Sequence, residues 1–176
     1  MQNRRSKRPI SSVASRPSLP WKRAVIGVVL LYLALQMYPL FINSSAGSVV
    51  SSWNAAMLWG ALRAIGQHTS LEGSSVVTDL VNFSVIPDCT IFAPLALFTV
   101  GVLVFPSTVL EKFQAVVLGI LFLSLTNLLR LLTLYGMLGT FPEMFDAVHL
   151  FIWQPLMAMT ALVLWGIWAA RRTRRA

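Results

Sequence analysis

Residues 113–134 read FQAVVLGILFLSLTNLLRLLTL, and this stretch decides the fold class. It contains a single charged side chain, Arg130. As a helix it would be about 33 Å long, because each residue adds about 1.5 Å. The hydrocarbon core of a bilayer is about 30 Å thick, so the stretch predicts a transmembrane helix.

Three further apolar segments flank this one, at residues 24–41, 88–105 and 148–170, and Pro155 is expected to kink the last of them. The whole chain of 176 residues is 56% hydrophobic and only 11% charged, which is unlike a soluble domain. We therefore expect an all-α integral membrane protein with about four transmembrane helices. A cleaved signal peptide is the alternative for residues 24–41, but the apolar run is long for a signal core and favours a retained anchor.

The remaining segments predict smaller elements. Residues 49–65 place Val50, Trp53 and Met57 on one helical face, which indicates an amphipathic helix at the membrane interface. Residues 66–87 are polar and rich in β-formers, and they predict a short extracytoplasmic β-hairpin. Residues 1–23 are expected to be a disordered basic tail, and residues 171–176 a second basic tail. The transmembrane domain is then residues 24–170.

The positive charges define the expected topology. The net charge is +8, and eleven basic residues lie before the first apolar segment or after the last: Arg4, Arg5, Lys7, Arg8, Arg16, Lys22, Arg23, Arg171, Arg172, Arg174 and Arg175. This distribution is typical of membrane topology signals and unlike a nucleic-acid-binding surface. Both termini are expected in the cytoplasm, which requires an even number of crossings.

Three residues from different predicted helices should lie at one level of the membrane. Cys89 is expected at the outer start of the second span, and His149 at the outer start of the fourth. Arg130 lies 17 residues beyond Phe113, which is about 25 Å along the third span. Asn127 precedes Arg130 by one turn and is expected either to orient the guanidinium or to bridge helices.

Each of these residues also has a non-catalytic interpretation. Arg130 near a helix end can extend to lipid phosphate, a single His149 is more often an interfacial histidine, and Cys89 alone is usually a small buried hydrophobe. On these terms the protein is a non-enzymatic membrane scaffold that binds lipid headgroups. A transporter is disfavoured, because one intramembrane charge without a paired carboxylate makes a poor ion path.

Taken together, the three residues suit nucleophilic catalysis. A thiol attacks a carbonyl as the thiolate, and a helix N-terminus, a nearby arginine and a histidine base all favour that form, while Asp88 opposes it. Arg130 is also suited to stabilise the oxyanion that forms after attack. The only cysteine, Cys89, excludes an internal disulfide and a multi-cysteine metal site, and no metal or cofactor is expected.

Around these residues, in PDCTIF (87–92), TNLLRLLTLYG (126–136) and FDAVHLFIWQ (145–154), the chain resembles the exosortase/archaeosortase family of membrane-embedded cysteine transpeptidases and proteases. It is most similar to the exosortase H type, and the similarity spans residues 24–170. The resemblance assigns the family's Cys, Arg and His to Cys89, Arg130 and His149, and its preceding Asn to Asn127. One departure is Ile91, where the family usually has glycine.

The resemblance implies a substrate class and a location. Family substrates are secreted proteins that end in a sorting tail, which consists of a recognition motif, a transmembrane helix and a basic cluster. The expected reaction cleaves this tail through a thioester, which water or an amine then resolves. The expected location is the bacterial inner membrane, with the active site facing the periplasm. Membrane lipids are the other expected partners, and nucleic acid is not one.

Overall fold

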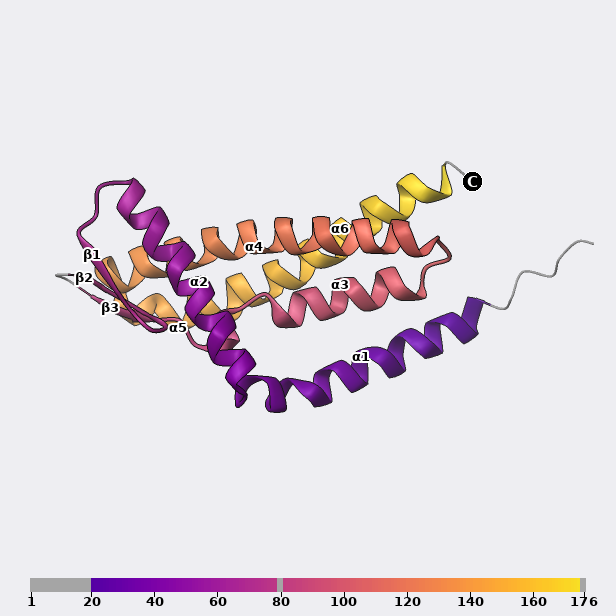
Figure 1. The fold of residues 1–176 in the computed structure, drawn as a ribbon, viewed down its shortest axis with the longest axis horizontal. Helices are drawn as coiled ribbons and strands as arrows, with labels where there is room; N and C mark the ends of the chain where they lie inside the picture. The colour runs from indigo at the N-terminus through magenta and orange to yellow at the C-terminus, as the bar shows by residue number, and fades with distance from the viewer. Residues whose placement is uncertain (1–19, 79–80, 175–176) are drawn as a thin grey trace, which may run out of the picture.

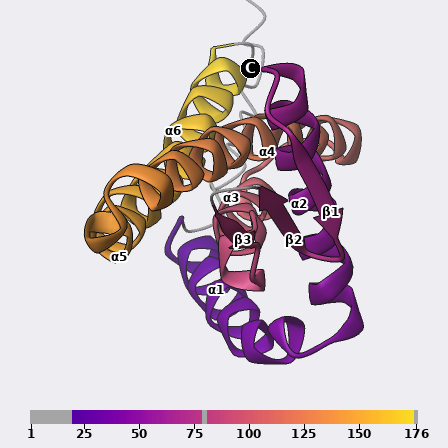
Figure 2. The ribbon, with the colours of Figure 1, turned by 90° about the vertical axis from the view of Figure 1, so that its left-hand side faces the viewer.

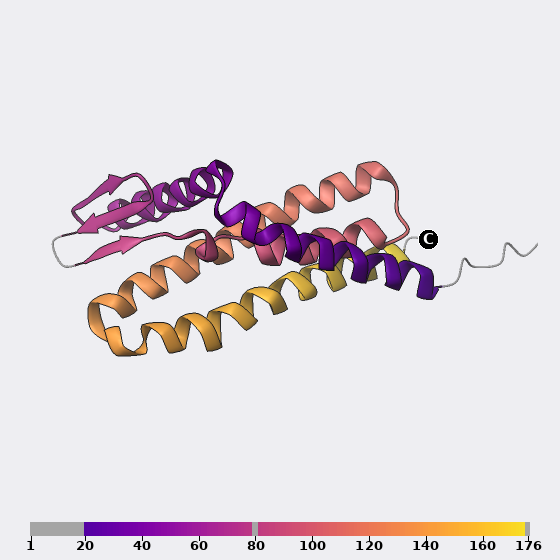
Figure 3. The same ribbon diagram turned by 90° about the horizontal axis from the view of Figure 1, so that it is seen from below.

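The computed structural model describes residues 20–78 and 81–174 and is mainly helical. Helices α1 (Pro20–Ile42), α3 (Phe92–Val104), α4 (Val109–Thr140) and α6 (Gln154–Thr173) run roughly along the long axis of the molecule (Figures 1 and 3). Helix α2 (Ser45–Ala64) crosses this direction steeply, and a small sheet lies at one end. We call that end the sheet end and the opposite one, where α1 begins and α6 finishes, the basic end. The expected disordered tail falls largely on residues 1–19, outside the described residues.

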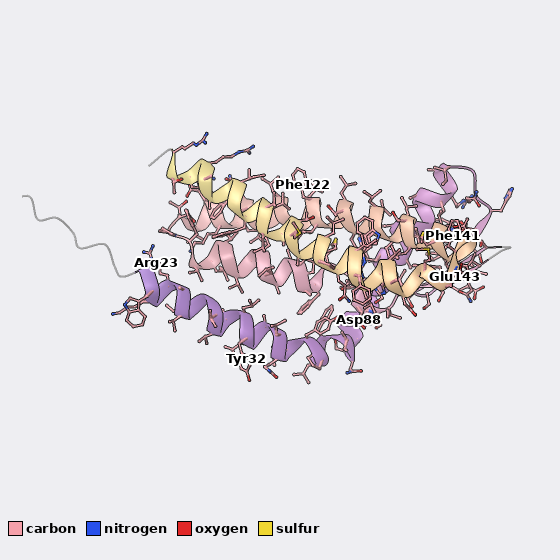
Figure 4. The ribbon with its side chains drawn as sticks, turned by 180° about the vertical axis from the view of Figure 1, so that it is seen from behind. Arg23, Tyr32, Asp88, Phe122, Phe141 and Glu143 are labelled. Carbon is pink, nitrogen blue, oxygen red and sulfur yellow. The ribbon has the colours of Figure 1, made fainter. Side chains whose placement is uncertain are left out.

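Three stretches of helix are long and apolar enough to cross a membrane: Trp21–Ile42, Val109–Thr140 and Pro142–Thr173. These identify a membrane-associated protein. Large apolar side chains such as Tyr32 and Phe122 point away from the bundle (Figure 4), as expected for a surface that contacts lipid. Residues 20–23 were expected in the N-terminal tail and are helical, and residues 171–173 continue α6.

The second expected span is shorter than predicted. Residues 88–105 were expected to be helical throughout, but Pro87–Cys89 is a 3-10 turn, and α3 begins only at Phe92. The Thr90 hydroxyl donates to the Pro87 carbonyl at 2.7 Å, which stabilises the turn in competition with a helix. The 13 residues of α3 are about 20 Å long, less than the hydrocarbon thickness. The prediction of four full spans is therefore not confirmed.

The third expected span is longer than residues 113–134. Thr108 and Glu111 form a reciprocal capping box that starts α4 at Val109. At the far end the helix continues to Thr140, and Tyr135 and Leu138 of this added part pack against the core that contains Val76 and Phe83 of the sheet. Tertiary contacts thus extend the helix beyond its uniformly apolar part.

Helix α2 presents a different face to the protein from the one expected. Ser44 caps its start by accepting from the Gly47 N–H. The buried face carries Ser51, Asn54, Ala55, Leu58 and Leu62, whereas Trp53 of the predicted apolar face is 70% exposed. Helix α2 therefore packs on the bundle through a face that includes two polar residues.

The expected hairpin at residues 66–87 is a three-stranded antiparallel sheet in the order β1–β2–β3. The strands are β1 (Thr69–Glu72), β2 (Ser75–Thr78) and β3 (Asn82–Ser84), and Gly73 forms the first turn with φ +61°. Seen along the bundle from the sheet end, the strands lie beside α2 (Figure 2). The sheet closes a core that includes Val76, Phe83 and Val85.

Two glycines let the helices near the basic end approach closely. A Cβ at Gly119 of α4 would lie 2.4 Å from the Phe98 ring of α3, and one at Gly101 would lie 2.8 Å from Trp165 of α6. Arg172 and Glu111 form an ion pair at 2.5 Å between α6 and α4. Figure 4 places Arg23 at this same end and Phe141 and Glu143 at the opposite one.

Candidate active site

Cys89 is the last residue of the 3-10 turn that precedes α3, and its side chain is only 3% exposed. Its N–H donates to the Ile86 carbonyl at 2.9 Å, which fixes the backbone of the turn. Ile91, at the position where a glycine was expected from the family pattern, has φ −79°, a conformation open to any residue. The local backbone therefore does not require glycine there.

Arg130 lies on the buried face of α4 and is also 3% exposed. Its Nη2 atom lies 2.6 Å from Nε2 of His149, so the guanidinium is paired with another buried side chain. The alternative in which Arg130 extends to lipid phosphate does not fit this burial.

His149 is buried on a π-helical segment, Val148–Trp153, between the short helix α5 (Phe145–Ala147) and α6. The irregularity has a cause in the sequence. Pro155 has no N–H to donate, and the Gln154 N–H bonds to the His149 carbonyl, five residues back. Such π-turns occur frequently at functional sites. Here the predicted kink takes the form of a wider turn that carries the histidine.

The three predicted side chains meet. Nε2 of His149 lies 3.9 Å from Sγ of Cys89 and 2.6 Å from Nη2 of Arg130. A guanidinium can only donate hydrogen bonds, so Nε2 must be the acceptor, and the imidazole proton is on Nδ1. Asp146, one turn earlier, is exposed and makes no hydrogen bond to His149 among the described residues.

Burial opposes the thiolate form of Cys89. Burial raises the pKa of Cys89 above its usual value, and the nearby Arg130 only partly offsets this. As expected, Arg130 lowers the pKa of Cys89 and Asp88 raises it, but desolvation is the largest effect and the net direction is upward. The thiol requires a base before it can attack.

Asn127 is fully buried, and of its two expected roles the structure shows the bridge between helices. Its Nδ2 donates to the Cys89 carbonyl at 3.0 Å and to Oδ1 of Asn54 at 2.9 Å. Its Oδ1 has no partner among the described residues, and neither has Nε of Arg130. Asn127 therefore orients the cysteine segment and not the guanidinium.

Two further residues, neither of them predicted from the sequence, contact this site. Asn54 of α2 is 6% exposed and bonds to Asn127. Tyr38 of α1 donates from its hydroxyl to Asp88, which Figure 4 shows near the end of α1. The sequence does contain a signal for Asn54, because Asn54 shares a helical face with Leu58 and Leu62. The face with Val50, Trp53 and Met57 gives the stronger apolar pattern and masks this signal.

A groove of about 440 Å³ leads to the site between α1, α3 and α6. Leu31, Leu35, Leu97 and Met157 make its apolar part. Its polar part contains Tyr38, Asp88, Thr90, Arg130 and Gln154. Arg130 thus faces both the groove and His149. Across residues 20–78 and 81–174, no three His, Cys, Asp or Glu side chains gather as a metal-binding group.

Comparison of the chain with protein families, curated protein sequences and solved structures finds no match. The chemistry of the site is therefore inferred from the contacts among Cys89, Arg130 and His149.

Proposed function

We propose that the protein is a membrane-embedded cysteine protease or transpeptidase that cleaves the C-terminal sorting tail of secreted proteins. The single observation that carries this proposal is the contact of Cys89, Arg130 and His149 around one imidazole nitrogen. A nucleophile, a base and a cation within reach of one another form a constellation suited to acyl transfer.

The resting contacts imply that the substrate activates the base. Nε2 of neutral His149 has one lone pair, and both the Arg130 guanidinium and the Cys89 thiol are donors to it. While Arg130 occupies that lone pair, His149 cannot accept the thiol proton. A substrate carbonyl oxygen that draws Arg130 away frees Nε2, so the thiolate forms only when its target is present.

The reaction then follows from these positions. His149 takes the proton of Cys89, and Sγ attacks the scissile carbonyl carbon while Arg130 stabilises the oxyanion. The tetrahedral intermediate collapses, the C–N bond breaks, and His149 returns the proton to the leaving amine. The resulting thioester is resolved by water, giving a protease, or by an amine, giving a transpeptidase.

The groove supports a substrate with an apolar segment next to the cleaved bond. Its apolar part lies between helices that are long and apolar enough for a membrane, and its polar part adjoins Arg130. We propose that the helix of the sorting tail lies in this groove, with its recognition motif at the polar end. A tail with a basic cytoplasmic end has the same direction as α6.

The distribution of charge supports a location in the bacterial inner membrane. The start of α1 and the basic residues at the end of α6 lie at one end of the bundle, and Lys112 is in the first turn of α4, next to Glu111, which pairs with Arg172 of α6. The positive-inside rule favours this end as the cytoplasmic one, and the proposal therefore has the Cys89 site facing the periplasm. The scaffold alternative is disfavoured, because Arg130 and His149 bond to each other and are buried away from lipid headgroups.

The test is processing of a co-expressed secreted reporter that carries a tail of motif, apolar helix and basic cluster. We expect Cys89→Ala and His149→Ala to abolish cleavage. His68→Ala is the matched control, since His68 is an exposed histidine outside the site, and it should cleave normally. Cleavage that persists in Cys89→Ala would show that the enzyme proposal is wrong.

A further inference from the structure

Helix α2, which the sequence predicts to lie at the membrane interface, contributes a side chain to the network behind the nucleophile. We infer that Asn54 is a positioning residue, which holds the nucleophile segment in place through Asn127. The inference builds on the proposed role of Cys89, since positioning has a catalytic meaning only if that thiol reacts. It assigns α2 a function in the site.

The hydrogen bonds fix the orientation of both amides. The Cys89 carbonyl can only accept, so the Asn127 atom that faces it at 3.0 Å must be the nitrogen. In the same way, the Val50 carbonyl accepts from Nδ2 of Asn54 at 2.7 Å, which turns Oδ1 of Asn54 toward Asn127. Two backbone carbonyls therefore determine the donor and acceptor directions of the hydrogen bonds that connect α2 to Cys89 through Asn127.

Both donor hydrogens of Asn127 are used in this chain. One goes to the Cys89 carbonyl and the other to Oδ1 of Asn54, at 2.9 Å. Without the second acceptor, the amide of Asn127 is free to rotate away from Cys89. The acceptor oxygen of Asn54 is thus the feature that matters, and not only the volume of its side chain.

Ser51 provides the internal control for this inference. It lies one turn before Asn54 on the same buried face and is 2% exposed. Its hydroxyl has no partner among the described residues. If the buried face of α2 were only a packing surface, truncation at either position would affect the site similarly.

Processing of the tail-bearing reporter is the first measurement. We expect Asn54→Ala to lower the rate by about 10- to 100-fold, as small displacements of a nucleophile do. Asn54→Asp keeps an acceptor oxygen and should retain most activity, whereas Asn127→Asp replaces the donor and should lose it. Ser51→Ala should match the wild type.

Both aspartate variants bury an acid and lose a donor to a backbone carbonyl, that of Val50 for Asn54→Asp and that of Cys89 for Asn127→Asp. Only Asn127→Asp breaks the bond to Cys89 directly, so the comparison of the two variants decides the question even if Asn54→Ala does not fold. If Asn54→Asp processes the reporter at least about tenfold faster than Asn127→Asp, the result supports the proposed series of hydrogen bonds from Asn54 through Asn127 to Cys89. Equal activity of these two variants, or Asn54→Ala equal to Ser51→Ala, overturns it.

A second measurement does not depend on the proposed enzyme activity. The rate at which a small alkylating reagent modifies Cys89 reports how firmly its segment is held. We expect several-fold faster alkylation in Asn54→Ala and no change in Ser51→Ala. If the wild type does not process the reporter, the proposed function fails while this comparison still tests the positioning role. Equal alkylation in the two variants overturns the positioning role alone.

Discussion

The bundle near the basic end and the region beneath the sheet differ in what they bury. Near the basic end, α3, α4 and α6 bury Phe98, Val102, Ala115, Leu123 and Ala161. Beneath the sheet, α2 and α4 enclose a second core, and the buried polar or charged residues of the described chain gather at its edge: Ser51, Asn54, Thr90, Asn127, Arg130 and His149.

The difference shows that burying polar and charged groups costs more free energy in one region than in the other, although a stable bundle does not require such groups. A charged side chain at the centre of a membrane helix costs about 2.5–3.5 kcal/mol, and buried polar groups need hydrogen-bond partners. The core near the basic end is built from small and apolar residues and buries no charged side chain, although the Nε1 atoms of Trp165 and Trp168 beside it have no partner among the described residues. The region beneath the sheet accepts it and leaves polar atoms of Asn127 and Arg130 without partners. The two regions should therefore respond differently to substitution.

The largest expected effect is at Arg130. Arg130→Ala should lower reporter processing by about 100- to 1,000-fold, because the developing oxyanion loses its donor. Arg63→Ala is the matched control, since Arg63 of α2 is exposed and lies over the Trp59 ring. Equal processing by the two variants would remove the functional distinction between the regions.

The pH dependence of thiol reactivity sharpens the comparison. Burial raises the pKa of Cys89, so less thiolate is present at neutral pH than for an exposed cysteine. Alkylation of Cys89 should therefore rise with pH over a higher range than alkylation of Ser70→Cys in a Cys89→Ala background, since Ser70 is exposed. A lower range for Cys89 would mean that Arg130 holds a thiolate at rest.

Substitution near the basic end should affect stability and not chemistry. Gly119→Ala places a Cβ against the Phe98 ring and should destabilise the protein by about 1–3 kcal/mol. Thermal unfolding measures this loss, and processing per folded molecule should stay close to wild type. Gly136→Ala is the control, because nothing lies within 4 Å of a Cβ there. Equal unfolding temperatures for the two variants would contradict the close packing of α3 on α4.

The smallest expected effect is at the ion pair of the basic end. Arg172→Ala removes the contact with Glu111, and both side chains are partly exposed. Such pairs contribute about 0–1 kcal/mol, so unfolding should change little and processing not at all. A large loss of stability would show that the pair anchors α6 on α4.

The sequence predicts the parts of this molecule that depend on local composition. The apolar run at 113–134 predicted a membrane helix, and the spacing of Cys89, Arg130 and His149 predicted their common level. The length of α3 was not predictable in this way, because the Thr90 hydroxyl competes for the Pro87 carbonyl and delays the helix. The extension of α4 to Thr140 depends on contacts with the sheet.

The residues of the site were predicted from the sequence, but their hydrogen-bond partners were not. Helical spacing placed Asn127 one turn from Arg130, yet its donors are used by Cys89 and Asn54. No local pattern reveals a partner 73 positions away in the chain. The raised pKa of Cys89 also depends on burial that only the assembled helices and sheet provide.

The most direct test of the central claim is whether Cys89 forms a thioester with the substrate. The measurement is the intact mass of the purified membrane protein after reaction with a tail-bearing substrate and an acid quench. We predict an added mass equal to the substrate fragment before the cut, which hydroxylamine removes and Cys89→Ala lacks. Cleavage without an adduct, at the same rate in Cys89→Ala, would contradict the account.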